Sequence, residues 1–354
     1  MTTHPQPAWS AGKDRPYIIA EAGVNHNGQL DLALQLIDAA CSTGTDSVKF
    51  QAFSADQLVT RQALKAAYQH TSASPGESQY DMLKRYELTA DELAAIQQHC
   101  QQRSIDLIVT PFSPQWIPPL DRLNISAFKI GSGNINSLEL LQAIGRTTRP
   151  VIVSTGMAEL PEIEQALDTL RHAGSRDIAV LHCVSLYPTK LKQANLYAVQ
   201  ALQKAFPDLP VGFSDHTEEI ITGALAVAAG AVILEKHFTL DKTLPGPDHA
   251  MSLVPSELQS YIEKARLAAQ VCGLPQKKPL PEEMEIKKAA RMSVVAAAFI
   301  PAGTVLTAEM LTVKRPGTGI PAHKKHELIG SVALRDISPD QILTSRDIDT
   351  DRNH

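Results

Sequence analysis

From residue 17 onward the chain repeats one pattern of apolar and polar positions. A short run of apolar, β-forming residues comes first, then a polar turn, then a longer stretch with apolar residues every three or four positions. Runs of the first kind predict strands, and stretches of the second kind predict amphipathic helices. The predicted strands number eight: Tyr17–Ala22, Ser47–Ala52, Asp106–Pro111, Ala127–Gly131, Val151–Thr155, Ile178–Ser185, Val211–Ser214 and Ala231–His237. Their apolar residues do not alternate with polar ones, which is typical of parallel strands covered on both faces.

Predicted helices lie between these runs. Leu30–Cys41, Ala90–Arg103 and Leu160–Ala173 have the helical spacing, and Ser256–Cys272 follows the eighth strand behind the favourable helix start Pro255-Ser256-Glu257. Eight strand–helix units within about 255 residues predict an α/β fold of the (β/α)₈ type, the TIM barrel. A doubly wound open sheet is the alternative, although such a sheet rarely needs eight regular units.

The pattern changes near Gly273. A linker rich in proline and lysine contains a short predicted helix, Glu282–Ala290. Short β-like runs then alternate with Pro- and Gly-rich turns, which predicts a small β-rich domain. The predicted organisation is a tail at residues 1–16, a barrel at 17–273, a linker at 274–290 and the small domain at 291–354. A domain of that size is marginally stable alone, so we expect it to dock on another surface.

Composition excludes several classes of protein. The 354 residues are 44% hydrophobic, which fits a globular chain with one large and one small domain. The net charge of −5 argues against a nucleic-acid partner. No apolar run reaches the roughly 18 residues that span a bilayer, and residues 1–14 lack the apolar core of a signal peptide. Four widely spaced cysteines without a CxxC pair indicate the reduced cysteines of a cytoplasmic enzyme.

Polar residues stand at the end of nearly every predicted strand. In a barrel the C-terminal strand ends meet at one face, and the chemistry takes place there. The residues at or just beyond these ends are Glu21, Lys49, Gln51, Thr110, Lys129, Ser132, Ser154, Ser185, Tyr187, Ser214, His216, Glu235, His237 and Asp248. Random placement of surface residues would not produce this arrangement, so the sequence predicts a polar site at the mouth of the barrel.

Two lysines and several hydroxyl groups within this set are typical of a phosphate site. Lys49 and Lys129 would supply positive charge, while Ser132, Ser154 and glycine-loop amides would supply directional donors. Either lysine could instead pair with a strand-end carboxylate. Lys129 could also form a Schiff base, as in barrel aldolases, because burial lowers the pKa of a lysine. The sequence Gly131-Ser132-Gly133, directly after that lysine, favours phosphate.

Two histidines end neighbouring predicted strands. His216 and His237 could converge on one divalent ion and leave positions open for water and substrate. A lone histidine is more often a hydrogen-bonded structural residue, but carboxylates lie near this pair in the sequence: Glu21, Asp215, Glu235 and Asp248. No cysteine thiolate is evident beside them, so the ligand set suits Mn²⁺, Mg²⁺ or Co²⁺ better than Zn²⁺.

Two loops near the predicted mouth need a separate interpretation. The segment Asn25-His26-Asn27-Gly28 is typical of a βα turn, and a proton shuttle through His26 is the alternative. The long loop after the second strand is long enough to form a lid over the site. Its candidate residues are Tyr68, Gln69, Ser78, Gln79 and Tyr80.

Several longer segments resemble the sialic acid synthase family. They are Ile19-Ala20-Glu21-Ala22-Gly23-Val24-Asn25-His26-Asn27-Gly28, Lys129-Ile130-Gly131-Ser132-Gly133, Ser154-Thr155-Gly156-Met157, Gly212-Phe213-Ser214-Asp215-His216-Thr217, Glu235-Lys236-His237-Phe238-Thr239-Leu240-Asp241, Pro245-Gly246-Pro247-Asp248-His249 and Val313-Lys314-Arg315-Pro316-Gly317-Thr318-Gly319. The resemblance runs in order from about residue 17 to residue 348, and motifs of this length are highly specific.

The resemblance implies a metal-dependent transferase that forms a C–C bond. Members condense phosphoenolpyruvate with an N-acetylmannosamine-type aldehyde sugar, which yields a nine-carbon 2-keto acid and phosphate. They pair the barrel with a small antifreeze-like (SAF) domain in a domain-swapped homodimer. By resemblance His216 and His237 bind Mn²⁺ or a similar ion, and Arg315 of the partner chain reaches the N-acetyl group of the sugar. Phosphoenolpyruvate is then surrounded by Lys49, Lys129, Ser132, Ser154, Thr110, Ser185 and Ser214, and the metal, water and sugar by Glu21, Gln51, Tyr187 and Asp248.

One position departs from the resemblance. Members often carry an acidic residue after Ser-Gly in the fourth strand's loop, whereas Asn134 stands here and brings no charge to the sugar hydroxyls. The stretches Lys65-Ala66-Ala67-Tyr68-Gln69 and Glu77-Ser78-Gln79-Tyr80-Asp81-Met82-Leu83-Lys84 resemble members that make legionaminic-type sugars. The resemblance therefore implies N-acetylneuraminate or, through 2,4-diacetamido-2,4,6-trideoxymannose, N,N'-diacetyllegionaminate as the product, with pseudaminic acid a more distant third. A non-catalytic sugar-binding or ice-binding module is a further alternative, and the full set of polar strand-end residues argues against it.

Overall fold

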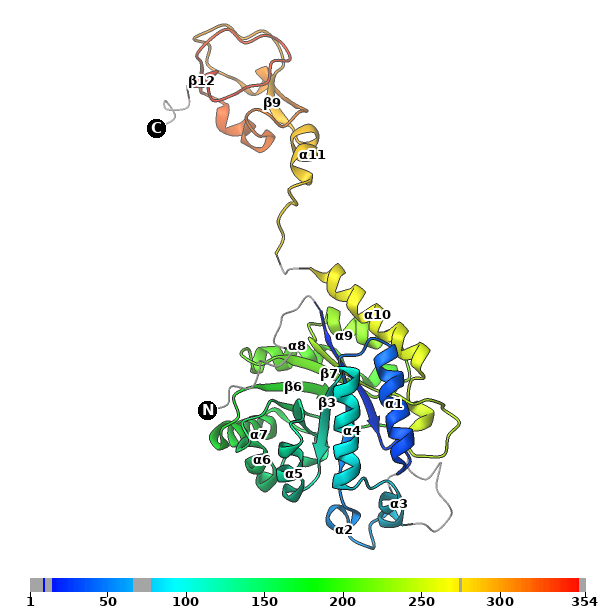
Figure 1. The fold of residues 1–354 in the computed structure, drawn as a ribbon. Helices are drawn as coiled ribbons and strands as arrows, with labels where there is room; N and C mark the ends of the chain where they lie inside the picture. Colours follow the sequence, from blue (N-terminus) through cyan, green and yellow to red (C-terminus); the bar gives the residue numbers. More distant parts are fainter. Residues whose placement is uncertain (1–8, 10–14, 66–77, 274–275, 350–354) are drawn as a thin grey trace. The chain divides into compact units, whose positions relative to one another are not determined.

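A computed structural model describes residue 9 and residues 15–65, 78–273 and 276–349. The chain divides into two compact units, Met1–Gly273 and Leu274–His354, which are described separately (Figure 1). Within the described residues, no helix has both the length and the apolar character that crossing a membrane requires. All four cysteines are free thiols.

The first unit is a closed barrel of eight parallel strands arranged in chain order, which confirms the predicted fold class. The strands are β1 (Tyr17–Gly23), β2 (Ser47–Ala52), β3 (Asp106–Pro111), β4 (Ala127–Ile130), β5 (Val151–Ser154), β6 (Ile178–Cys183), β7 (Val211–Asp215) and β8 (Ile233–His237). Strand β1 pairs with both β2 and β8, and this pairing closes the ring. Closure excludes the doubly wound sheet, which has two free edges.

Helices surround the barrel and cover its outer face (Figure 1). They are α1 (Leu30–Ser42), α2 (Ala55–Leu58), α3 (Gln79–Arg85), α4 (Ala90–Arg103), α5 (Ile117–Arg122), α6 (Leu138–Gly145), α7 (Leu160–Ala173), α8 (Tyr197–Ala205), α9 (Thr222–Ala228) and α10 (Pro255–Cys272). Helices α4 and α7 have the bounds that the apolar spacing predicts, and each begins with a capping box, Thr89 with Glu92 and Glu159 with Glu162.

Inside the barrel the side chains form an apolar layer and, above it, a polar layer. The apolar layer lies toward the N-terminal strand ends and contains Tyr17, Ile19, Ile108, Ala127, Ile152, Ala179, Leu181 and Ile233. Side chains two positions further along a strand point to the same side. The polar layer follows from that rule: Glu21, Thr110, Lys129, Ser154, Cys183 and Glu235 stand two residues after members of the apolar layer. The polar groups of the mouth therefore lie directly above a buried apolar layer.

Apolar residues also point outward and pack under the helices. Ile18, Phe50 and Leu234 belong to the large core between strands and helices, together with Leu93 of α4 and Leu167 of α7. Both faces of each strand are thus buried near the N-terminal end, which explains the uniformly apolar runs in the sequence. Trp9, from the predicted N-terminal tail, joins the inner apolar layer and packs edge-on against Tyr17, with ring centroids 5.3 Å apart.

The second unit is small and rich in β-structure. It contains α11 (Glu283–Ala290), the antiparallel pair β9 (Ser293–Ala296) and β10 (Leu311–Lys314), and the antiparallel pair β11 (Val332–Ala333) and β12 (Ile348–Asp349). Its own apolar core includes Val294, Ile300 and Leu343. Behind β10, the Ser293 hydroxyl donates to the carbonyl of Pro316 at 2.8 Å and accepts from the amide of Gly319 at 2.9 Å, which holds the loop after Arg315.

Candidate active site

The barrel mouth opens into a cavity of about 830 Å³. All of the barrel residues predicted for the site line this cavity except Asn134. The lining residues from that set are Glu21, Lys49, Gln51, Thr110, Lys129, Ser132, Ser154, Ser185, Tyr187, Ser214, His216, His237 and Asp248. They come from all eight strands or from the loops that follow them, so closure of the barrel assembles the site.

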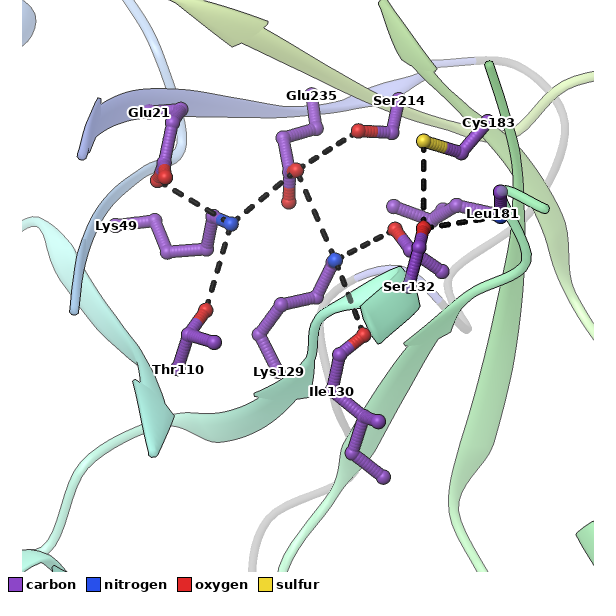
Figure 2. A network of polar contacts seen from close by, with 12 residues as sticks. Glu21, Lys49, Thr110, Lys129, Ile130, Ser132, Leu181, Cys183, Ser214 and Glu235 are labelled. Carbon is purple, nitrogen blue, oxygen red and sulfur yellow. Dashed lines mark hydrogen bonds and ion pairs between the residues drawn. The ribbon is translucent and has the colours of Figure 1, made fainter. Parts of the chain in front are cut away.

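Two buried lysines share one carboxylate at the floor of the cavity (Figure 2). The Nζ atom of Lys49 lies 3.2 Å from Oε1 of Glu235 and 3.3 Å from Oε2 of Glu21. The Nζ atom of Lys129 donates to the hydroxyl of Ser154 at 2.6 Å and lies 3.7 Å from the same Glu235 oxygen. The lysines thus pair with strand-end carboxylates, as in the alternative to a phosphate site, and both also line the cavity.

Burial and mutual attraction determine the charge state of this cluster. Burial lowers the pKa of Lys129 to about 8, against the attraction of Glu235. Burial also lowers the pKa of Lys49, but Glu21 and Glu235 outweigh that effect and leave it raised. Burial alone would raise the pKa of Glu235, yet Lys129 and Lys49 bring it down to about 2. At neutral pH both lysines are therefore charged beside the Glu235 carboxylate, and Glu21 pairs with Lys49 on the other side.

His216 and His237 lie side by side at the mouth, with ring centroids 5.4 Å apart. The Nδ1 atom of His216 lies 2.7 Å from the carbonyl oxygen of Val184. A carbonyl oxygen only accepts, so Nδ1 carries a proton, and Nε2 has a lone pair for a ligand bond when the ring is neutral. Burial lowers the pKa of His216, but Cys183 beside it outweighs that effect and leaves the pKa raised. The Nδ1 atom of His237 is buried without a hydrogen-bond partner and lies 3.8 Å from Oδ2 of Asp248.

These two imidazoles fit a divalent ion with open positions. In the described parts of the chain, no group of three or more His, Cys, Asp or Glu side chains converges as a metal-binding set. Two histidines would therefore leave most of the coordination sphere to water and substrate. Burial and the neighbouring His216 hold the pKa of His237 well below its usual value, which keeps its ring neutral, as a metal ligand must be.

Further polar side chains complete the mouth. The amide of Gln51 donates to Glu21 at 3.1 Å. Burial raises the pKa of Glu21 against the pull of Lys49, and burial with nearby Glu21 raises the pKa of Asp248 to about 7. The ring of Tyr187 lies against that of His216, with centroids 4.2 Å apart.

Several polar atoms that line the cavity have no protein partner. Ser185 Oγ, Glu235 Oε2 and His237 Nδ1 are buried and make no hydrogen bond in the structure. Buried polar groups are normally satisfied, so a set of unsatisfied ones facing one cavity is typical of a ligand site. The mouth is thus a polar cavity with two buried ammonium groups and several unsatisfied polar atoms, which is typical of a ligand site.

Sequence comparison identifies the protein family. Residues 36–277 match the NeuB family, and residues 291–349 match the SAF domain. The chain belongs to the NeuB family. Several relatives bear the names of legionaminic acid and sialic acid synthases, so this NeuB-family chain belongs to a family of sugar-acid synthases.

Two relatives and one solved structure illustrate the similarity. The N,N'-diacetyllegionaminic acid synthase of Legionella pneumophila is 41% identical over 319 residues, which cover 89% of each chain. The enzyme of the same name from Campylobacter jejuni is 40% identical over 328 residues, covering 92% of this chain and 98% of that one. A crystal structure of N-acetylneuraminic acid synthetase from Leptospira borgpetersenii has a TM-score of 0.70 and 33% identity, covering 78% of this chain and 91% of its own.

Some sequence-predicted residues lie elsewhere in this NeuB-family chain. Asn134 is half-buried and does not line the cavity, and Arg315 is exposed in the second unit. Asp215, predicted near the metal, points away from the mouth and pairs with Lys236 at 3.1 Å, because the alternation that turns His216 inward turns its neighbour outward. His26 belongs to a turn, since its Nδ1 accepts from the amide of Gly28 at 3.0 Å.

The predicted lid is only partly described. Tyr68 and Gln69 lie outside the described residues. Gln79, at the start of α3, lines the cavity, whereas Ser78 caps this helix by accepting from the amide of Asp81 at 3.1 Å. Tyr80 is bound to the Asp56 carboxylate at 2.6 Å.

Two strand residues that line the mouth matter more to it than the sequence indicates. Glu235 holds both lysines, and its position two residues before His237 is a usable signal, because both must face the same side. Cys183 lies 3.9 Å from Nδ1 of His216, so the expectation that no thiol stands beside the histidines is wrong. This sulfur contacts the ring nitrogen that faces Val184, away from the nitrogen left for a metal.

An apolar wall on one side of the cavity was also missed. It comes from the loop after β1, from segments around α2 and α3, and from the residue after β3, which are separate in the sequence. Its residues are Val24, Leu58, Val59, Met82, Leu83, Tyr86 and Phe112. Most of them also form one compact apolar cluster. The cavity therefore has a cationic floor and an apolar wall, which suits a ligand with one charged and one methyl-bearing part.

Proposed function

We propose that the protein condenses phosphoenolpyruvate with an N-acetylated aldehyde sugar to give a nonulosonic acid and inorganic phosphate. The observation that carries this proposal is the buried pair of lysines at the barrel mouth, Lys49 and Lys129, beside unpartnered polar atoms. Their charges match the carboxylate and phosphate of phosphoenolpyruvate, and the hydroxyls of Ser132 and Ser154 add directional donors.

The reaction balances without a redox step. C3 of phosphoenolpyruvate forms a bond to the aldehyde carbon of the sugar, and the aldehyde oxygen takes a proton. Water adds at C2, and the resulting tetrahedral centre loses phosphate as the C2–O bond breaks, which leaves a 2-keto acid. Positive charge that develops at C2 and negative charge on the leaving phosphate are both held within a buried, preorganised cluster of charges.

A divalent metal at His216 and His237 belongs to the same proposal, with Mn²⁺ the best match and Mg²⁺ or Co²⁺ as alternatives. When bound there, it would polarise the sugar aldehyde as a Lewis acid. Glu21, held by Gln51 at 3.1 Å, is positioned to orient or deprotonate the water or to handle the proton at the aldehyde oxygen. Asp248 and Tyr187 stand beside the histidines on the sugar side.

Two acceptors fit the chemistry, N-acetylmannosamine and 2,4-diacetamido-2,4,6-trideoxymannose. The apolar wall favours the second, because that sugar has a C6 methyl and a second acetamido methyl to bury there. Two relatives near 40% identity bear the name of N,N'-diacetyllegionaminic acid synthase, which supports the same choice. Arg315, exposed on its loop in the second unit, is accessible for a contact with the N-acetyl group in a domain-swapped homodimer.

Phosphate release measured with each acceptor in parallel tests the proposed function. We expect release only when phosphoenolpyruvate, an N-acetylated aldehyde sugar and Mn²⁺ are all present, with products confirmed by mass. The kcat/KM should be higher for the diacetamido sugar. Higher turnover of N-acetylmannosamine would make the product N-acetylneuraminate, and no release with any acceptor, or full activity in EDTA, would contradict the proposal.

A crowded glycine provides a second test of the phosphoenolpyruvate site. A Cβ atom at Gly156 would lie 2.2 Å from Oγ of Ser185 and 2.8 Å from Oγ of Ser132. Gly156→Ala must therefore displace both hydroxyls, and we expect KM for phosphoenolpyruvate to rise about tenfold or more, since small misplacements at a site are costly. Gly145→Ala is the matched control, because a Cβ there would be similarly crowded, 2.5 Å from Cβ of Ala173, but lies outside the residues that line the cavity. Equal kinetics in the two variants would show that these hydroxyls do not contact the substrate.

A further inference from the structure

Behind the two histidines, on the outer side of the barrel, lies a buried ion pair. Oδ2 of Asp215 and Nζ of Lys236 are 3.1 Å apart, and their side chains are 0% and 1% exposed. The parallel register of β7 and β8 places these two residues opposite each other. Each directly precedes a histidine of the mouth, so the pair links the two strand ends at the point where His216 and His237 turn inward.

The same pair also holds the loop that begins with His216. Oδ1 of Asp215 accepts from the amide of Thr217 at 2.9 Å and from its hydroxyl at 2.7 Å, while the Thr222 hydroxyl donates to Oδ2. Lys236 donates to the carbonyl of Thr217 and, at 3.3 Å, to that of Glu219. Lys236, which precedes His237, is thus bound to Asp215 on one side of His216 and to the backbone of Thr217 on the other side.

A buried ion pair is weak evidence for a role in stability, because an apolar pair of similar volume often serves as well. This pair also makes hydrogen bonds to the loop after β7, so it fixes the distance and orientation of the ends of β7 and β8. We propose that Asp215 and Lys236 are positioning residues that set the spacing of His216 and His237 and thereby the affinity of this site for a divalent ion.

The inference rests on the metal of the proposed function. A site with two protein ligands depends strongly on their spacing, because no further protein ligand can compensate when one imidazole moves. Groups behind metal ligands typically change metal affinity by about 10–100-fold when they are altered. Asp215 and Lys236 reach the ligands through the backbone, so they should affect metal binding even when no substrate is present.

Binding of Mn²⁺ to the full-length protein without substrate tests the inference, with free Mn²⁺ measured by electron paramagnetic resonance. Lys236→Met and Asp215→Asn should each raise the Kd for Mn²⁺ by about 10–100-fold. The double variant should bind no more weakly than the weaker single variant, because the two residues act as one unit. An unchanged Kd in folded single variants would overturn the inference, and no binding to the wild type would overturn the proposed metal itself.

Two controls separate positioning from loss of stability. Leu170 lies on the buried face of α7, and Leu170→Ala should lower Tm yet leave the Kd for Mn²⁺ unchanged. If that variant weakened Mn²⁺ binding as much as Lys236→Met, general destabilisation would explain the effect and the inference would fail. If both charge variants fail to fold, Thr222→Val removes one donor to Asp215 and leaves the ion pair in place. It should raise the Kd by about threefold or more, and an unchanged Kd would overturn the inference.

Discussion

Replacing His237 with alanine is expected to abolish Mn²⁺ binding and to lower kcat by about 10³-fold or more. A divalent ion bound at the proposed site would contribute several kcal/mol of transition-state stabilisation, and each 1.36 kcal/mol corresponds to a factor of ten in rate. His237 is one of two imidazoles at the mouth, and its buried Nδ1 has no partner in the protein. The loss of one ligand from a pair leaves a single histidine, which cannot hold the ion at ordinary concentrations.

Activity and Mn²⁺ binding should be measured on the same preparation, with EDTA-treated wild type for comparison. His182→Gln is a suitable control, because His182 is also buried but points outward, where its ring stacks on Phe213 and its Nε2 bonds the carbonyl of Ala194 at 2.8 Å. This control should keep its Mn²⁺ affinity and most of its kcat. A His237→Ala enzyme that turns over normally, or wild type that is fully active in EDTA, would remove the metal from the mechanism.

Much of the barrel could be predicted because its strands carry two signals at once. Apolar runs mark where each strand lies, and the polar residue at its C-terminal end marks the mouth. The step from Ile19 to Glu21 and the step from Ile233 to Glu235 both follow the two-residue period of a strand. The candidate site was therefore largely predictable as a set of strand-end residues.

The errors arise where the sequence does not indicate which face of a strand a residue occupies. A strand buried on both faces has no polar–apolar alternation, so adjacent residues at its end are equally good candidates. The sequence therefore suggests Asp215 as a neighbour of the metal and does not single out Cys183, although the structure turns the first outward and the second inward. The apolar wall could not be predicted either, because Val24, Met82 and Phe112 meet only through tertiary packing.

Replacing Lys129 with methionine is expected to raise KM for phosphoenolpyruvate by roughly 10–100-fold, since a hydrogen bond to a charged group contributes about 1.5–3 kcal/mol. Stability should hardly change. Methionine has a similar length and no charge, and Glu235 keeps Lys49 at 3.2 Å and the Ser214 hydroxyl at 2.9 Å. Burial of an ammonium disfavours its charge, as the lowered pKa of Lys129 indicates, so its removal also relieves a cost of folding.

The pH dependence of the wild type should reflect the same lysine. The pKa of Lys129 is about 8. When the pH is below this value the side chain is charged and attracts the anionic substrate, and when the pH is above it the charge is lost. The kcat/KM for phosphoenolpyruvate should therefore fall as the pH rises through about 8, because this ratio reports the free enzyme. Lys129→Met should lack that decline. Lys242 does not line the cavity, and its Nζ atom lies 2.7 Å from a carboxylate oxygen of Glu257, so Lys242→Met should retain the decline.

A lowered lysine pKa is also what a Schiff-base enzyme requires, so the assignment of Lys129 needs a chemical test. Borohydride reduces an imine between a lysine and a keto acid to a stable secondary amine. If Lys129 binds phosphate by charge, wild type treated with pyruvate and borohydride should keep its activity and gain no mass. Inactivation with the mass of a reduced pyruvyl adduct on Lys129 would instead make the enzyme an aldolase. The Gly131-Ser132-Gly133 loop beside it, with Ser132 donating toward Cys183 at 3.5 Å and lining the cavity, favours the first result.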